Sequence, residues 1–441
     1  MSLAEAAETI QEYYMRHSDR TSCPEYRALS RRQFMLSTAA ASATLLTGPS
    51  FPRVAFADSH NSKRDILVSI FLRGGCDGLS MCVPHGDQAY YEARPALGIP
   101  RPDRRRPGAV TDLDGFFGLP PAMTPLLEAY HAKNLLFVQA CGSKDETRSH
   151  FDAQFSMESG QTHGATVKNG WIGRHLMSVQ PARKDALIRA IGVAPGLQQR
   201  LIGSPGALPI RDLADYRLYG DPDTERARLR ILGDMYRETA TLLSTASVHT
   251  QRVLQLFEAL DLQRYQPRGP AKYPETEFSH ALKSSAALIR ADVGVEALAI
   301  DMDGWDTHSD QGAVEGPMAE LMENLAGSLS AFHADAIADS ETQVTVVIMS
   351  EFGRVVAENG SRGTDHGHGN VMILMGQGIA GGRVLRKWPG LQRDKLFQGQ
   401  DLEVTIDYRD VLAEVIQKRL DNQGVDKVFP GYRPTAHGVT A

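Results

Sequence analysis

The chain alternates between short apolar runs and longer amphipathic stretches, and this alternation predicts its secondary structure. The apolar runs are rich in β-branched residues, which is typical of buried parallel strands. They lie at 66–72, 135–140, 187–193, 295–300, 344–349 and 371–375. Because helical stretches separate most of them, we expect an α/β fold: a doubly wound, mostly parallel sheet.

The stretches between these runs carry apolar residues at helical spacing. One of them places Leu321, Leu325, Leu329 and Phe332 on a single face, as an amphipathic helix does. The predicted helices cover 121–133, 211–263, 317–338 and 408–420. We interpret a span of about 211–290 as a helical insertion in a single domain, and we find no internal repeat.

The N-terminal region has the form of a twin-arginine export signal. Ser30-Arg31-Arg32-Gln33-Phe34 precedes a mild apolar stretch, and Ala55-Phe56-Ala57 offers a cleavage site. The apolar stretch has about 14 residues, short of the ~20 needed to span a bilayer. We therefore predict a signal over 1–57 and a mature domain over 58–441. The predicted protein is periplasmic or secreted, uses the twin-arginine export machinery and keeps no stable membrane anchor; an ordinary amphipathic helix is the alternative.

Composition and charge narrow the functional class. The chain has 441 residues, is 42% hydrophobic and 23% charged, and has a formal net charge of −6. This balance is typical of a folded globular protein and argues against nucleic-acid binding. An arginine-rich segment at 101–106 is flanked by proline, and we interpret it as a solvated loop.

The cysteines do not form a recognisable metal or disulfide framework. Outside the predicted signal they are Cys76, Cys82 and Cys141, with no Cys-x-x-Cys pair. One disulfide could form in an oxidising compartment, but single buried thiols are the simpler interpretation.

Polar clusters follow at least three of the predicted strands, where the ligand sites of open α/β sheets lie. The candidate metal ligands are Asp77, Asp306, His308, Glu351, Asp365, His366 and His368. Carboxylates and imidazoles in this pattern predict one or two divalent ions, Zn, Mn, Mg or Ca. A turn-forming role for Asp77 and a loop hydrogen-bond network for residues 365–368 are the alternatives.

Two arginines are candidates for holding an anionic group. The planar fork of Arg354 could clamp a phosphate or sulfate, and a surface salt bridge is its alternative role. Arg148 is the second candidate. These residues predict a small anionic substrate.

Several motifs together resemble one large bacterial family. They are Leu72-Arg73-Gly74-Gly75-Cys76-Asp77-Gly78-Leu79, Ser149-His150-Phe151-Asp152-Ala153-Gln154, Trp305-Asp306-Thr307-His308, Ser350-Glu351-Phe352-Gly353-Arg354, Gly363-Thr364-Asp365-His366-Gly367, Trp388-Pro389-Gly390 and Asp407-Tyr408-Arg409. The family is domain of unknown function 1501, whose members are typically exported by the twin-arginine route. It looks like a distant branch of the alkaline phosphatase/sulfatase superfamily. That resemblance implies a doubly wound α/β fold with a one- or two-metal site that hydrolyses phosphate or sulfate esters.

The resemblance also implies roles for particular residues. Asp77 matches a superfamily metal ligand after the first strand, and Asp306 with His308 matches another pair at shorter spacing. The implied nucleophile is Ser149, beside His150, although Thr147 is an equal rival. A sulfatase-type formylglycine is not supported, because Cys82-Val83-Pro84 lacks the arginine that completes the motif.

Two registers remain open for the last ligands. In one, Asp365 and His366 form the superfamily's Asp-His pair. In the other, Ser350-Glu351-Phe352-Gly353 takes that place and His366 or His368 is the final histidine. The second register suits the strand order better, because Asn370 leads directly into a strand, and it would weaken or remove one metal.

We therefore predict an exported, metal-dependent hydrolase of phosphate or sulfate esters. The alternative is an exported binding protein that keeps the fold without catalysis. A redox enzyme is a third hypothesis, but the glycine pattern at 376–381 follows a late strand and is a weak dinucleotide signal.

Overall fold

The computed structural model describes residues 64–161, 167–218, 220–221, 224–237 and 241–441. The predicted export signal lies outside these residues. All six predicted strands are present, with ends shifted by a few residues. They are β1 (Ile66–Leu72), β4 (Leu135–Gly142), β5 (Ala190–Val193), β7 (Ala297–Met302), β8 (Val344–Ser350) and β9 (Asn370–Gly376).

These strands form one large sheet with the order β10-β4-β9-β8-β1-β7-β5-β6. Its short strands are β6 (Ala207–Pro209), β10 (Arg383–Leu385) and β11 (Ile406–Asp407), and β11 pairs with β4. Only β9 among the strands of this sheet runs antiparallel to its neighbours, so the mostly parallel α/β sheet is confirmed. A separate antiparallel pair joins β2 (Thr111–Asp112) to β3 (Gly118–Leu119).

The direction of β9 has a consequence for the site. The segment 351–369 leaves the carboxyl end of β8 and enters β9, which runs the opposite way. This segment therefore begins and ends at one edge of the sheet, where β1 and β7 also end.

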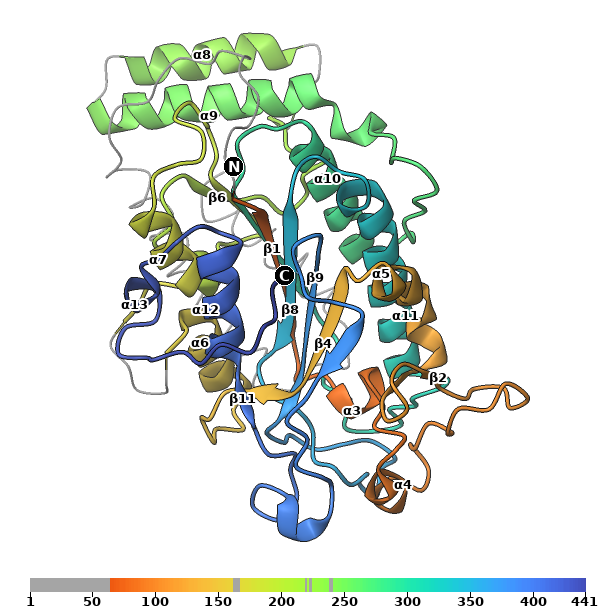
Figure 1. The fold of residues 1–441 in the computed structure, drawn as a ribbon. Helices are drawn as coiled ribbons and strands as arrows, with labels where there is room; N and C mark the ends of the chain where they lie inside the picture. The colour runs from red at the N-terminus through yellow and green to blue at the C-terminus, as the bar shows by residue number, and fades with distance from the viewer. Residues whose placement is uncertain (1–63, 162–166, 219, 222–223, 238–240) are drawn as a thin grey trace.

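Helices cover both faces of the sheet, as Figure 1 shows. One face packs against α5 (Leu127–His131), α10 (Glu277–Arg290) and α11 (Pro317–Phe332). The other packs against α6 (His150–Ser159), α7 (Trp171–Ser178), α12 (Tyr408–Lys418) and α13 (Val425–Val428). Alternate residues of β1 serve the two cores: Val68 and Ile70 face the first, Leu67 and Phe71 the second.

Two helices of the predicted insertion, α8 (Glu225–Arg237) and α9 (Thr241–Leu260), pack on each other at one end of the molecule (Figure 1). The span about 211–290 also contains α10, which contacts β7 and α11 and so belongs to the sheet's helical layer. No helix in the described part of the chain is both long and apolar enough to cross a membrane.

Two predicted helices differ in detail. Residues 121–133 begin as a 3-10 helix, Pro121–Leu126, before α5, because Pro125 has no N–H to donate. The helix predicted at 317–338 ends in a π-helical turn, His333–Ile337. The remaining short helices are α3 (Gly78–Met81), α4 (Gln88–Ala93), Gln199–Leu201, Leu262–Arg264 and Arg393–Lys395. Cys76, Cys82 and Cys141 are buried free thiols.

Candidate metal centre

Four segments meet at the carboxyl edge of the sheet. The ends of β1, β7 and β8 are level there, because Leu72 pairs with both Met302 and Ser350. Residues just beyond these ends, together with the start of α6, supply the polar side chains. Gly74 permits the close approach: its φ is +120°, and a Cβ there would lie 2.6 Å from the backbone nitrogen of Asp306.

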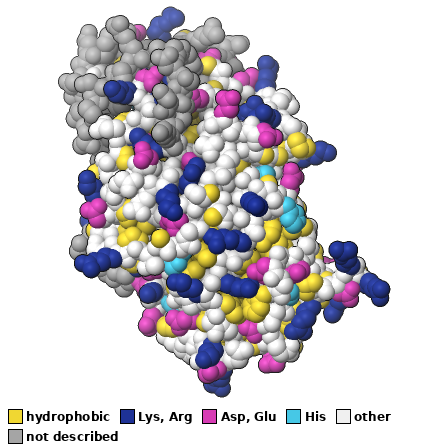
Figure 2. Space-filling view, in the orientation of Figure 1, with side chains coloured by type: hydrophobic (Ala, Val, Ile, Leu, Met, Phe, Trp, Pro, Cys, Tyr) yellow, Lys and Arg dark blue, Asp and Glu magenta, His cyan; other side chains and the backbone are white. Residues whose placement is uncertain are grey.

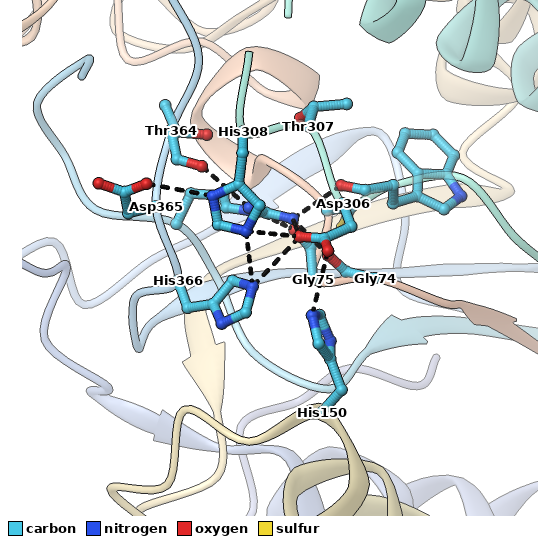
Figure 3. Close-up of polar contacts among 12 residues, drawn as sticks. Gly74, Gly75, His150, Asp306, Thr307, His308, Thr364, Asp365 and His366 are labelled. Carbon is cyan, nitrogen blue, oxygen red and sulfur yellow. Dashed lines mark hydrogen bonds and ion pairs between the residues drawn. The ribbon is translucent and has the colours of Figure 1, made fainter. Parts of the chain in front are cut away.

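Asp306 lies at the centre of a cluster of histidines (Figure 3). Its Oδ1 is 2.9 Å from Nε2 of His308 and 3.1 Å from Nε2 of His366. Its Oδ2 is 3.5 Å from Nε2 of His150. The Nε2 atoms of His308 and His366 are themselves 2.9 Å apart. Each of the three imidazoles thus points its Nε2 atom at the carboxylate of Asp306.

Each imidazole is oriented by an acceptor on its other nitrogen. Nδ1 of His150 lies 2.8 Å from a carboxylate oxygen of Glu351, and Nδ1 of His308 lies 3.1 Å from Asp365. Nδ1 of His366 lies 3.0 Å from the backbone carbonyl of Arg148. Metal-binding histidines usually have such partners, because a hydrogen bond at Nδ1 leaves Nε2 free to bind an ion.

The charges in the cluster reinforce one another. Burial alone would raise the pKa of Asp306, but hydrogen bonds from the three histidines and the Arg354 charge hold it well below its usual range. Burial alone would lower the pKa of His150, but its bonds to Asp306 and Glu351 raise it to about 9. A hydrogen bond to Asp306 also raises the pKa of His308. The raised pKa values of His150 and His308 favour protons on these two imidazoles beside Asp306, and a bound cation would replace such protons.

The donor set fits a single divalent ion. Ligand atoms of His150, Asp306 and His366 all lie within 4.8 Å of one another. Nε2 of His150 is buried, and its contact with Asp306 is at the limit of a hydrogen bond at 3.5 Å, so this nitrogen is only weakly satisfied by the described residues. Imidazole nitrogens with one carboxylate suit zinc and similar ions better than magnesium or calcium, which prefer all-oxygen sites.

A family model described as "Protein of unknown function (DUF1501)" matches residues 64–428. This chain belongs to that family. The family resemblance in the sequence is therefore confirmed. No curated protein matches the chain.

One solved structure with detectable similarity is the phosphonoacetate hydrolase from Sinorhizobium meliloti 1021 in complex with phosphonoformate. The two share 10% identity over 66% of this chain and 56% of that one, with a TM-score of 0.27. A likeness this distant carries no argument about the site of the DUF1501 chain.

Asp77 lies outside the cluster. It is fully buried, and Arg94 binds both its oxygens, at 2.6 and 3.0 Å. Ser80 and Gln311 donate two further hydrogen bonds. Burial would raise the pKa of Asp77, but the charge and hydrogen bonds of Arg94 lower it. The structure thus gives Asp77 an internal ion pair in place of the predicted metal contact.

Glu351 lies beside the cluster, as the partner of His150. Its Oε1 also accepts from the Gly74 amide and from Nε2 of Gln154, both at 2.9 Å. Burial would raise its pKa, but the hydrogen bonds and charge of His150 and the bond from Gln154 hold it near 2. With these donors in place, Glu351 contacts the cluster through Nδ1 of His150.

Arg354 is buried and is not placed to clamp a substrate. Its guanidinium bonds to Asp306 at 2.8 Å and otherwise to backbone carbonyls, those of Gly74, Gly75, Trp305 and Thr364. Its role here is to hold three segments together beneath the cluster. The surface salt bridge weighed as its alternative is also excluded, because the side chain has no exposed surface.

Three other predicted residues lie at the periphery. The side chain of Asp365 is 60% exposed and lies 3.1 Å from Nδ1 of His308. The ring of His368 stacks on Phe397, and burial, the larger effect, together with the Arg148 charge lowers its pKa to about 4. The guanidinium of Arg148 binds Asp401 at 2.7 Å.

The predicted nucleophile Ser149 lies at the N-cap of α6, next to His150. Its amide donates to Oγ1 of the rival Thr147 at 3.2 Å. The family resemblance placed His150 beside the implied nucleophile Ser149. In the structure, His150 is the innermost of the candidate ligands. The spacing of His150, Gln154 and Glu158 at every fourth position was the available signal, because it places them on one helix face.

Proposed function

We propose that this protein is a hydrolase that depends on one divalent metal ion, held by His150, Asp306 and His366. The observation that carries the proposal is the convergence of Nε2 atoms on Asp306 while acceptors anchor every Nδ1. His308 is a further ligand candidate on the exposed side. An ion bound here would supply Lewis-acid polarisation of a substrate's ester group. Zinc is the first candidate, followed by manganese.

The class of substrate that we propose is a small phosphate or sulfate ester. The family's predicted place in the alkaline phosphatase/sulfatase superfamily supports this class by analogy only. Ser149 remains the proposed nucleophile, because it starts α6 directly before His150. The positive end of the helix dipole at the start of α6 would favour a negatively charged group beside the hydroxyl.

One observation favours the alternative, an exported protein that binds without catalysis. Both arginines expected to hold the anion are engaged by the protein: Arg354 by carbonyls and Asp306, and Arg148 by Asp401. A substrate anion would have to compete with these partners. The two proposals share the metal site and differ in whether turnover occurs.

The test begins with metal analysis of the purified mature protein and titration with Zn²⁺, Mn²⁺ and Mg²⁺. We expect one tightly bound ion in the wild type and none in His366→Ala. His368→Ala is the matched control, because that ring lies outside the cluster. Aryl phosphates and sulfates then separate the two proposals. Metal uptake without turnover favours the binding protein, and no metal uptake and no turnover refutes the hydrolase.

We also propose export by the twin-arginine pathway, with the mature protein periplasmic or secreted. The Arg31-Arg32 motif and the cleavage site at Ala57 support this proposal. Replacement by Arg31→Lys and Arg32→Lys should leave uncleaved protein in the cytoplasm. Export that continues unchanged in this variant would contradict the pathway.

A further inference from the structure

A buried chain of polar side chains leads from the end of β1 to the metal centre. Nη1 of Arg73 lies 3.1 Å from Oε1 of Gln154, and Nε2 of Gln154 lies 2.9 Å from Oε1 of Glu351. The same carboxylate oxygen lies 2.8 Å from Nδ1 of His150, whose Nε2 faces Asp306. Three short contacts therefore connect an arginine to a candidate ligand.

The direction of every bond in this chain is determined. A guanidinium can only donate, so Oε1 of Gln154 accepts and its Nε2 must donate onward to Glu351. The Gly74 amide, which also can only donate, reaches the same oxygen of Glu351 at 2.9 Å. With two such donors directed at it, this oxygen acts as an acceptor. His150 must then donate from Nδ1.

Arg73 is itself held firmly. Its guanidinium binds both oxygens of Glu158, each at 3.0 Å, and Asp301 at 2.9 Å. Arg200 binds the same two carboxylates, at 2.6 Å each, and has no exposed side-chain surface. A buried network of this kind costs little further entropy to keep in place, since its side chains are already ordered.

We infer that Arg73, Gln154 and Glu351 form a positioning relay that fixes the tautomer of His150 and so presents its Nε2 to the metal ion. An imidazole with one proton carries it on Nδ1 in this arrangement, which leaves the Nε2 lone pair free to bind. The opposite tautomer would place a proton where the ion must sit. This inference rests on the proposed metal site and assigns Glu351 to orientation in place of ligation.

The relay is also built into one helix. His150, Gln154 and Glu158 lie four residues apart on α6, so all three side chains project from the same face. The first faces Asp306 and the proposed ion, the second bonds to Glu351, and the third anchors Arg73. A single rotation of α6 would therefore disturb the ligand and its orienting groups together.

Glu351→Gln tests the relay with almost no change of shape. The Gly74 and Gln154 donors keep the new amide oxygen at the Oε1 position, where it is an uncharged and weaker acceptor for Nδ1 of His150. We therefore expect the Zn²⁺ affinity to fall by about 10–100-fold. In Zn²⁺-loaded wild type, ¹H–¹⁵N spectra of labelled histidine should show His150 with a proton on Nδ1 and the metal on Nε2. At a free Zn²⁺ concentration that just saturates the wild type, the variant should show much less of that pattern, which a loss of stability alone would not change.

Glu414→Gln is the matched control. Glu414 is equally buried, accepts hydrogen bonds from the backbone N–H groups of His437, Gly438 and Thr440, and lies outside the relay. Its substitution should lower stability and leave the Zn²⁺ affinity unchanged. Gln154→Leu serves as a second variant if Glu351→Gln does not fold, with an expected loss of about tenfold.

The outcomes separate the relay from the proposed function. Wild-type protein that takes up no Zn²⁺ refutes both. If the wild type takes up Zn²⁺, and Glu351→Gln and Gln154→Leu leave the Zn²⁺ affinity and the His150 spectrum unchanged, the relay alone is refuted. A loss of affinity equal in Glu351→Gln and Glu414→Gln also refutes it, because stability would then explain the effect.

Discussion

Asp306→Asn is the most direct perturbation of the proposed metal centre. It keeps the shape of the side chain and removes the charge that three imidazoles and Arg354 share. Asp306 is 18% exposed and sits at the point on which the candidate ligands converge. The substitution therefore separates charge from packing better than a truncation would.

The expected loss of metal affinity follows from the ligand role. Removing a group that only supports a ligand typically costs 10–100-fold. Removing the one charged candidate ligand should lower the metal affinity by at least the upper end of this range. That is a factor of about 100, which corresponds to about 2.7 kcal/mol. We therefore expect the Zn²⁺ affinity of Asp306→Asn to fall by two orders of magnitude or more.

The expected loss of fold stability is smaller. Arg354 loses a charged acceptor but keeps the carbonyls of Gly74, Gly75, Trp305 and Thr364. A hydrogen bond to a charged group contributes about 1.5–3 kcal/mol, and the new amide oxygen recovers part of it. The metal-free variant should thus be less stable by about 1–2 kcal/mol and remain folded.

Two assays measure these effects separately. Urea unfolding with a chelator gives the stability of the metal-free protein, and competition with a chromophoric chelator gives the Zn²⁺ affinity. Asp65→Asn is the control, because Asp65 is also bound by an arginine, Arg419, but precedes β1 and so lies at the opposite end of that strand from the cluster. An affinity of Asp306→Asn within threefold of wild type would refute the proposed ligand set, and so would an equal loss in Asp65→Asn.

Three further predictions concern the rest of the molecule. Asp77→Asn should destabilise the fold by about 3–5 kcal/mol in urea unfolding, because it leaves Arg94 charged and buried, without changing the metal stoichiometry. A change in stoichiometry would return Asp77 to the ligand set. His368→Ala should leave the Zn²⁺ affinity unchanged in calorimetry, and a tenfold loss would contradict its place outside the cluster. Burial, aided by the charges of Arg64 and Arg189, lowers the pKa of His175 to about 3. The unfolded chain therefore binds a proton below pH ~6.5 that the folded protein does not, and this residue should cost about 2 kcal/mol of stability between pH 8 and pH 5. His175→Gln should flatten that part of the stability profile, and an unchanged slope would exclude His175 as its cause.

Local pattern determined much of the fold. The apolar runs at 66–72 and 344–349 are rich in β-branched residues and are shorter than a typical helix. Their composition and length alone therefore predicted strands. The polar motifs that follow them also had to lie at the carboxyl edge of a parallel sheet. The sequence thus predicted that Asp306, His308 and His366 would meet, because each comes just after or between strands.

Tertiary structure decided which polar groups remain available to an ion. Asp77 and Asp306 both follow strands in glycine-containing turns, but Arg94 occupies the first and imidazoles surround the second. The pattern of residues along the chain does not predict that Arg94, at the C-terminal end of α4, binds Asp77. That contact depends on how α4 packs against the rest of the fold. The sequence by itself determined a family, its strands and a pool of acids and histidines at one edge. Only folding decided the candidate ligand set, because a carboxylate that already pairs with a buried arginine, as Asp77 does with Arg94, has its charge satisfied and is not available to the proposed ion.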